Sequence, residues 1–334
     1  MTLTWSERIP GTDSTSSSRI DVNELYEVSA AVLRRGQLRT GEMATFFEEA
    51  GGGLGYIQSS LPSAYVHDAL SAFDPTSIWG DTSCYDVTRG PSQKRFLETF
   101  VVLRRRIRAF LSWQEGCNGS WRYFGHAGGA APDPGATALA ALALLETPSL
   151  PGKQRWRRQA EAVEELTSGR GRGVDLATAA NALRLLALVG RDVEARIDSI
   201  LDRLREPRAE DVGDYRTPIA PAYAIVRAWE RASLPKQDEM RSLLLPLVLD
   251  RQREGGSFGA PLSTAMGLWV LRQSEHRGPE TQLARAALLE AAESHEGWPF
   301  ESFLPGGGGA LACTTAFALE ALASTALDED RPGQ

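Results

Sequence analysis

The stretch Asp133-Pro-Gly-Ala-Thr137-Ala-Leu-Ala-Ala-Leu-Ala-Leu144 opens with small residues and continues as an apolar run, and similar starts recur along the chain. Thr and Ser can cap a helix, and Ala lets neighbouring helices approach closely. The starts follow one another at steps of 41 to 55 residues. A step of about 43 residues holds two helices of about 14 residues and two loops. We therefore predict six helical hairpins, which begin at Asp81-Thr82-Ser83, Ala136-Thr137-Ala138, Ala177-Thr178-Ala179, Ala220-Pro221-Ala222, Ser263-Thr264-Ala265 and Thr314-Thr315-Ala316.

Apolar residues recur at helical spacing between these starts, and almost no strand pattern is visible. Leu176, Ala180, Leu183 and Ala187, for example, fall on one helical face. Because all six starts require small residues, closure of the hairpins into a ring explains the pattern better than an open superhelix of helix pairs. The open superhelix is the alternative. The predicted fold class is all-α, with the helix pairs arranged as a toroid.

Composition limits the kinds of partner that the chain can have. Its 334 residues carry a formal net charge of −7 without a basic stripe, which is a poor match to nucleic acid. The longest apolar run, 138–145, is too short to cross a bilayer, and the N-terminus lacks the pattern of a secretory signal. We expect a cytoplasmic protein with a loose leader over 1–20, one domain over 21–325 and a short tail over 326–334.

Three predicted loops join glycine to an aromatic residue: Gln114-Glu-Gly-Cys-Asn-Gly119-Ser-Trp121, Gln252-Arg-Glu-Gly-Gly-Ser-Phe258 and His295-Glu-Gly-Trp298. This order resembles the QW motif of squalene–hopene cyclases and the wider prenyltransferase/squalene-cyclase superfamily. The resemblance covers roughly residues 50 to 325. It implies an (α/α)6 barrel with inner and outer rings of helices around a central, largely apolar cavity. The chain is about half the length of full squalene–hopene cyclases, so it resembles a single-barrel member.

The catalytic motif of that family is only partly present. Class II terpene cyclases carry Asp-x-Asp-Asp-Thr-Ala, in which the middle Asp protonates an alkene. Here Asp133 and Thr137-Ala138 fit, but Gly135 stands at the middle position and cannot supply a proton. The segment Ser77-Ile-Trp-Gly-Asp81-Thr-Ser-Cys-Tyr-Asp86 fits the same frame with one Asp kept.

We therefore expect an atypical set of acids and bases at one rim of the barrel. Asp81 and Asp133 are the first candidates, and Asp86 lies one turn further along. Helix N-termini stabilise carboxylates at such positions. The alternative interpretation is that Asp81 and Asp133 only cap helices and that Asp86 is solvated or structural.

Aromatic rings suit a cavity that holds a hydrophobic or cationic guest, because ring faces stabilise positive charge. Tyr223 and Trp269 are the best candidates for its lining, since they lie one turn into predicted inner helices. His126 could act as a base near Asp133. The alternatives are that these rings pack between repeats and that His126 is an ordinary loop residue. The full candidate set for substrate binding is Trp79, Trp121, Tyr123, His126, Tyr223, Phe258, Trp269 and Trp298.

Metal and cofactor sites find little support in the sequence. Cys84-Tyr-Asp86 has the spacing, in reversed order, of two zinc ligands in protein prenyltransferase β subunits, which resemble this fold. The four histidines form no HxxxH pattern, the three cysteines form no CxxC pattern, and no phosphate-binding loop is present. We expect no metal and no cofactor.

The leading hypothesis is a terpene cyclase-like isomerase or lyase of natural-product biosynthesis. It would cyclise or rearrange a hydrophobic polyene or isoprenoid-derived substrate. One alternative is a non-catalytic ligand-binding or interaction barrel that has lost the acid, as Gly135 suggests. Another is a carbohydrate-active barrel with two carboxylates across a groove.

Overall fold

The computed structural model describes most of the chain, and the candidates Trp79, Asp81, Asp86 and His126 lie outside the described residues. The described residues are 22–48, 53–73, 91–125, 131–145, 153–168, 174–207, 211, 215, 217–295, 297–302 and 308–329.

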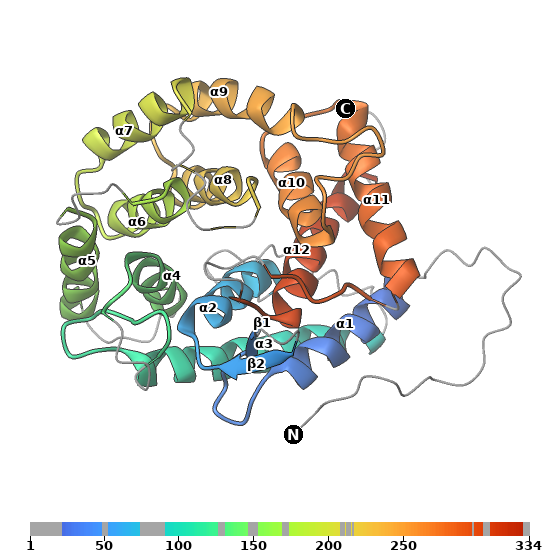
Figure 1. The fold of residues 1–334 in the computed structure, drawn as a ribbon, viewed down its shortest axis with the longest axis horizontal. Helices are drawn as coiled ribbons and strands as arrows, with labels where there is room; N and C mark the ends of the chain where they lie inside the picture. Colours follow the sequence, from blue (N-terminus) through green and yellow to red (C-terminus); the bar gives the residue numbers. More distant parts are fainter. Residues whose placement is uncertain are drawn as a thin grey trace, which may run out of the picture.

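Six helices form a closed inner ring, so the prediction of an all-α toroid is confirmed (Figure 1). Each inner helix packs against the next, and the last packs back against the first. The inner helices are α2 (Ser60–Ala69), α4 (Pro134–Leu145), α6 (Leu176–Leu188), α8 (Ala220–Ala232), α10 (Pro261–Gln273) and α12 (Leu311–Glu329). The last of them continues beyond residue 325, where we expected the barrel to end.

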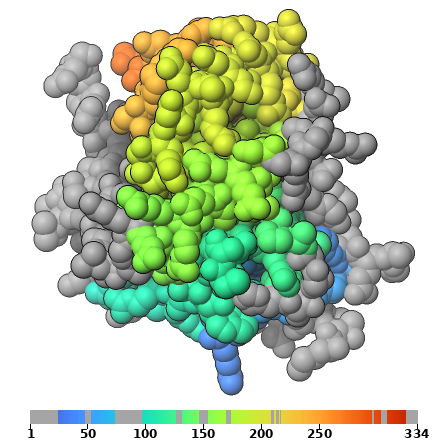
Figure 2. All heavy atoms as spheres, turned by 90° about the vertical axis from the view of Figure 1, so that its left-hand side faces the viewer, coloured from blue at the N-terminus to red at the C-terminus, as the bar shows by residue number. Residues whose placement is uncertain are grey.

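Six further helices form an outer ring that alternates with the inner one along the chain (Figure 1). The outer helices bury one face only, as α7 does with Ile197, Ile200, Leu201 and Leu204. The inner helices are buried nearly all round because they lie between the outer ring and the lumen. Figure 2 shows outer helices following one another in chain order up one side of the molecule. The outer helices are α1 (Val22–Gly36), α3 (Pro91–Gln114), α5 (Lys153–Ser168), α7 (Glu194–Arg205), α9 (Gln237–Leu249) and α11 (Pro279–His295).

The first inner helix begins earlier than the sequence predicts. We expected it at Thr82, but α2 occupies this place in the ring and starts at Ser60. Residue 82 lies outside the described residues. A single-turn helix, η1 (Leu70–Phe73), follows α2.

A small antiparallel sheet was not expected from the sequence. Its strands are β1 (Thr45–Glu48), β2 (Leu54–Ile57) and β3 (Gly308–Gly309), in the order β2-β1-β3. Phe46 pairs with Tyr56 on one side and with Gly309 on the other. The sheet therefore joins the loop before α2 to the loop before α12.

Three loops between outer and inner helices share one backbone geometry. The amide of Gly116 donates to the Ser120 carbonyl (2.8 Å), and Arg253 and Leu38 make the same bond to the residue four positions on. In each loop a glycine has positive φ, as at Gly256 (85°). A Cβ on Gly256 would lie 2.4 Å from the backbone of the next outer helix, so only glycine fits.

The shared loop geometry shows which residue occupies the Gln position of the QW-like motif in each loop, and it corrects our alignment of the first motif. Gln252 donates to the carbonyls of Gly256 and Glu280, both at 2.8 Å, and Gln37 makes the equivalent pair of bonds. In the loop that ends at Trp121 this position is held by Glu115, not by Gln114. Its carboxylate accepts from Gln159 at 3.1 Å and from an arginine of α5.

The small-residue starts have a specific partner in these loops. The amide of Trp121 donates to the Thr137 hydroxyl (3.0 Å), and the amide of Phe258 donates to the Thr264 hydroxyl at the same distance. Ser63 of α2 accepts in the same way from Met43. The hydroxyls therefore attach each loop to the inner helix that follows it.

Candidate functional site

The inner helices all begin at one end of the ring, because each follows an outer helix that brings the chain back to that end. We call this end the mouth and the opposite end of the lumen the floor. Asp133 caps α4 at the mouth: its Oδ1 accepts from the Ala136 amide at 2.7 Å, and the residue is half-buried. A Cβ on Gly135 would lie 3.0 Å from Thr178 Oγ1 and 3.3 Å from Asp133 Oδ1. Position 135 therefore faces the start of α6.

Asp175 caps α6 beside this position and is a carboxyl that the sequence analysis missed. Its Oδ1 accepts from the Thr178 amide (2.8 Å) and its Oδ2 from the Thr178 hydroxyl (2.7 Å). Burial raises the pKa of Asp175 even though both hydrogen bonds oppose the shift. The order Asp175-Leu-Ala-Thr178-Ala resembles Asp133-Pro-Gly-Ala-Thr137-Ala with one residue fewer, and this signal could have identified it.

Two tyrosines join across the lumen below the mouth. The Tyr65 and Tyr215 hydroxyls lie 2.9 Å apart, and both side chains are buried. Burial raises the pKa of both, and the charge of Asp175 adds to each shift. Tyr65 belongs to α2, which α4 separates from α6 in the ring. The Asp175 carboxyl therefore lies close enough to both tyrosines for its charge to act on them.

The floor of the lumen is a network of buried charges. Arg184 of α6 makes two hydrogen bonds of 2.9 Å to Asp68 of α2. Arg227 of α8 lies 2.8 Å from the same carboxylate and also binds Glu320 of α12. These contacts join four inner helices through side chains that are at most 5% exposed.

The charges of the floor set the ionisation of its carboxyls. Burial alone would raise the pKa of Asp68, but the guanidiniums of Arg184 and Arg227 overcome it and hold the pKa well below its ordinary range. Glu320 shares only one of these guanidiniums, and burial raises its pKa to about 7.

Tyr223 and Trp269, our best candidates for the lining, lie directly above this network. Their ring centroids are 4.9 Å apart, and the Arg227 guanidinium lies 5.4 and 5.3 Å from them. Tyr223 also donates to Glu320 (2.7 Å). The resemblance implies a largely apolar interior. That expectation is wrong for the floor, because paired charges and aromatic rings fill it.

Glu301 is a second mouth carboxyl that the sequence did not indicate. It lies on the loop before β3, and its Oε1 accepts from the Leu262 amide in the first turn of α10 (2.8 Å). Burial raises its pKa to about 7 against this single hydrogen bond.

The aromatic candidates in the repeat loops lie between the two rings of helices. Trp121 Nε1 donates to the Leu111 carbonyl of α3 at 2.8 Å, and Trp298 Nε1 donates to the Leu288 carbonyl of α11 at 3.1 Å. Both side chains are buried. These positions match the alternative in which loop aromatics pack between repeats.

The two other loop aromatics are also held by packing. Phe258 is buried against α10, where a Cβ on Gly267 would lie 2.5 Å from its ring. Tyr123 is half-buried beside Phe124, at a centroid distance of 4.6 Å.

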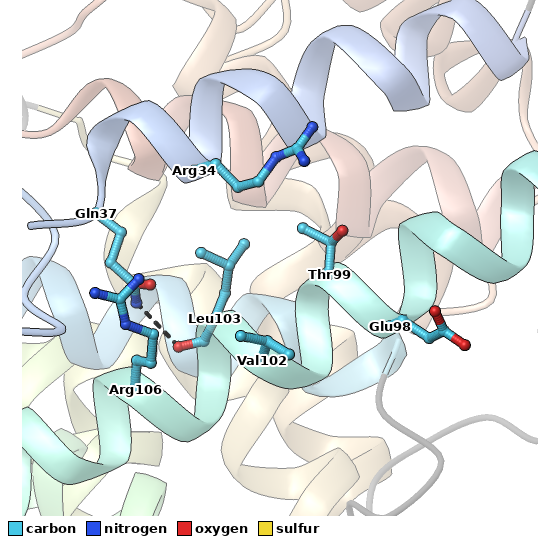
Figure 3. Close-up of a pocket in the computed structure, with 7 residues that line it drawn as sticks. All are labelled: Arg34, Gln37, Glu98, Thr99, Val102, Leu103 and Arg106. Carbon is cyan, nitrogen blue, oxygen red and sulfur yellow. Dashed lines mark hydrogen bonds between the residues drawn. The ribbon is translucent and has the colours of Figure 1, made fainter. Parts of the chain in front are cut away.

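A pocket of about 420 Å³ lies outside the barrel, between α1 and α3 (Figure 3). Gln37 is held there by its hydrogen bond to the Leu103 carbonyl, with Arg106 beside it and Glu98 at the far end. The pocket is separate from the mouth and from the floor. Its lining residues are Arg34, Gln37, Glu98, Thr99, Val102, Leu103 and Arg106.

The described residues offer neither a metal site nor a membrane span. No cluster of three or more His, Cys, Asp or Glu side chains suited to a metal ion occurs among them. None of their helices is both long and apolar enough to span a membrane.

Comparisons with known proteins identify the architecture. No protein-family model and no curated sequence matches the chain. Among solved structures, the type II terpene cyclase MstE from Scytonema without ligand is similar, with a TM-score of 0.59 and 13% identity over 91% of this chain and 99% of that one. An aspartate-to-alanine variant of MstE with its product merosterolic acid A has a TM-score of 0.62 at 14% identity, and covers 91% and 98%.

An arginine-to-alanine variant of MstE with its substrate geranylgeranyl dihydroxybenzoate has a TM-score of 0.59 at 14% identity, over 91% of this chain and 98% of that one. The chain therefore shares the (α/α)-barrel fold of MstE over 91% of its length.

Proposed function

We propose that this protein is a terpene cyclase-like enzyme that converts a linear, isoprenoid-derived substrate into a cyclic isomer. The observation that carries the proposal is the set of side chains that line the interior of the closed ring. Carboxyls with raised pKa lie at the mouth, and the aromatic rings of Tyr223 and Trp269 lie below them. A protonated carboxyl above aromatic faces is what a reaction started by a proton and continued by carbocations requires.

The reaction balances without a cofactor. A carboxylic acid transfers its proton to one carbon of a terminal alkene, and the positive charge forms on the more substituted carbon. The next double bond attacks that carbon, which forms a carbon–carbon bond and moves the charge along the chain. Loss of a proton to a base ends the sequence, so substrate and product have the same composition.

The residues of the lumen have distinct parts in this scheme. Tyr223 and Trp269 offer ring faces to the migrating charge. The guanidiniums of the floor are paired with carboxylates, which limits their repulsion of a carbocation. Asp133 remains a candidate acid or base at the mouth. We also keep as proposed site residues Asp81 and Asp86 for catalysis and Trp79 and His126 for substrate binding.

The likeness of the barrel to MstE supports a proposal for the substrate class. MstE binds geranylgeranyl dihydroxybenzoate, an isoprenoid chain on an aromatic acid. We propose a hydrophobic polyene of this general kind for the present chain, converted in the cytoplasm in a biosynthetic route to a natural product.

The direct experiment is incubation of the purified protein with linear farnesyl and geranylgeranyl compounds that carry diphosphate or dihydroxybenzoate head groups. Chromatography with mass spectrometry then looks for an isomer of unchanged mass, and NMR counts its remaining olefinic protons. We expect one compound to yield an isomer with fewer double bonds. Recovery of every compound unchanged would contradict the proposal.

A non-catalytic ligand-binding barrel is the second candidate, and Gly135 favours it because the position of the family's acid lacks a carboxyl. Native mass spectrometry distinguishes the two. A lipid that stays bound and is never converted would support the binding barrel.

A further inference from the structure

The position that lacks the family's acid is adjacent to another carboxyl. A Cβ on Gly135 would lie 3.0 Å from Thr178 Oγ1, and that hydroxyl lies 2.7 Å from Asp175 Oδ2. Only one hydroxyl group separates the place of the absent side chain from the Asp175 carboxyl. The neighbouring inner helix therefore supplies a second carboxyl at this position, besides Asp133 at the start of α4.

The start of α6, where this carboxyl lies, is close to α2 on the far side of α4. The charge of Asp175 acts on Tyr65 of α2. Further along α6, Arg184 makes hydrogen bonds to Asp68 of α2.

A second polar group lies on the same face of α6. Asn181 is between Thr178 and Arg184 at helical spacing and is only 3% exposed. Its Nδ2 has no hydrogen-bond partner among the described residues. This buried donor, one turn along α6 from the threonine that binds Asp175, offers a hydrogen bond to a polar group of a ligand.

The surroundings of Asp175 keep its proton available. Within the described residues its hydrogen bonds come from the amide and hydroxyl of Thr178, and no guanidinium bonds to it. Burial therefore favours the neutral acid. Once the proton has left, the same two donors and the N-terminus of α6 stabilise the carboxylate.

We propose that Asp175 is the acid that protonates the substrate alkene, in place of a carboxyl at position 135. This inference rests on the proposed function. In the step, the O–H bond of Asp175 breaks as a C–H bond forms at the alkene, and the charge passes to the adjacent carbon. The proton that the final carbocation loses returns through solvent, so Asp175 is restored and the net reaction is an isomerisation.

The test is Asp175→Asn, because Asn caps a helix as well as Asp does but cannot donate this proton. The probe is geranylgeranyl dihydroxybenzoate, or whichever linear isoprenoid the wild type converts. We expect kcat to fall by at least about 100-fold. Binding of the probe, measured by tryptophan fluorescence, and the thermal midpoint should stay the same.

The matched control is Asp192→Asn at the start of the outer helix α7, where Asp192 Oδ1 accepts from the Glu194 amide at 3.1 Å. It should keep full activity. Asp175→Ser, which also preserves a cap, is the second variant and should lose activity like the Asn variant.

Suppose that the wild type converts a substrate and that the kcat of Asp175→Asn, or of folded Asp175→Ser, lies within about threefold of the wild-type kcat. This result would overturn the assignment of Asp175 and leave the proposed function standing. A wild type that converts none of the isoprenoids would instead overturn the proposed function, and this inference with it.

Discussion

Asp68 is buried and Asp175 is half-buried on the inner ring, and their surroundings shift their pKa values in opposite directions. Asp68 lies on the floor between Arg184 and Arg227, which hold its pKa well below the ordinary range. Asp175 lies at the mouth with only neutral donors from Thr178, and its pKa is raised.

The contrast distinguishes a carboxyl that stabilises the fold, Asp68, from one that can donate a proton in a reaction, Asp175. An ionised Asp68 attracts two arginines from different helices and holds the inner ring together. It cannot donate a proton near neutral pH. A carboxyl whose pKa is pushed upward can do so, and such opposed pairs are typical of acid and base assignments in enzymes. We therefore assign the floor a structural role and propose the mouth as the place of the reaction.

The largest expected effect on stability is at the floor. Asp68→Asn leaves two buried guanidiniums without their shared carboxylate, which costs about 3–5 kcal/mol of unfolding free energy. Chemical denaturation followed by circular dichroism measures it. The control is Asp202→Asn, whose ion pair with Arg205 is exposed and should leave the transition unchanged. Equal stability of the two variants would show that the floor does not hold the ring.

Glu301, at the mouth, makes the free energy of unfolding depend on pH. Its pKa of about 7 in the folded protein exceeds the ordinary value of 4.5, so between these pH values the folded state binds more protons than the unfolded state. Stability therefore falls as pH rises from 4.5 to 7. Allowing for partial exposure, we expect a fall of about 2 kcal/mol from this group.

Glu301→Gln tests this pH dependence, because Gln keeps an oxygen acceptor for the Leu262 amide and removes the charge. Its unfolding free energy, measured at several pH values, should exceed that of the wild type at pH 8 and match it near pH 4.5. Glu290→Gln on the exposed face of α11 is the control and should follow the wild type. Parallel pH curves for wild type and Glu301→Gln would contradict the environment assigned to Glu301.

The sequence predicted the ring well wherever the local pattern repeats. Thr137, Thr178 and Thr264 each fall in the first turn of an inner helix. The start of α2 was missed because its hydroxyl, Ser63, has Met43 as its partner where the other loops have an aromatic residue. The donor to each hydroxyl is a backbone amide, which any residue except proline can supply. The sequence therefore does not mark this position.

The lumen was much less predictable than the ring. Asp175 was missed because it precedes its threonine by three residues, whereas Asp133 precedes Thr137 by four. The floor network joins Asp68 to Arg184 over 116 positions, and no local periodicity reveals such a pair. Closure of the ring brings these residues together, so they become visible only in three dimensions.

Substitution of Gly267 tests whether the Phe258 ring packs against α10 as the structure places it. An Ala in a helix is usually more stable than Gly by about 1 kcal/mol, but a Cβ at 267 would lie 2.5 Å from the Phe258 ring. We expect Gly267→Ala to destabilise the protein by about 1–2 kcal/mol. In a Phe258→Ala background the same change should be stabilising. The same sign in both backgrounds would place the Phe258 ring elsewhere.

The smallest effect on stability belongs to the mouth aspartate. Asp175→Asn should change the unfolding free energy at pH 7 by no more than about 0.5 kcal/mol, because both residues cap α6 equally well. Thermal unfolding beside Asp68→Asn checks it. A loss as large as that of Asp68→Asn would make Asp175 a structural residue and remove the contrast between mouth and floor.

Turnover in deuterium oxide tests the central claim, a cyclisation started by a proton from an acidic side chain. Carboxyl protons of the enzyme exchange with the solvent, so the first proton transferred to the isoprenoid is then a deuteron. With geranylgeranyl dihydroxybenzoate, or another linear isoprenoid that is converted, mass spectrometry should find a cyclic product that carries one carbon-bound deuterium. A cyclic product without carbon-bound deuterium would contradict the account.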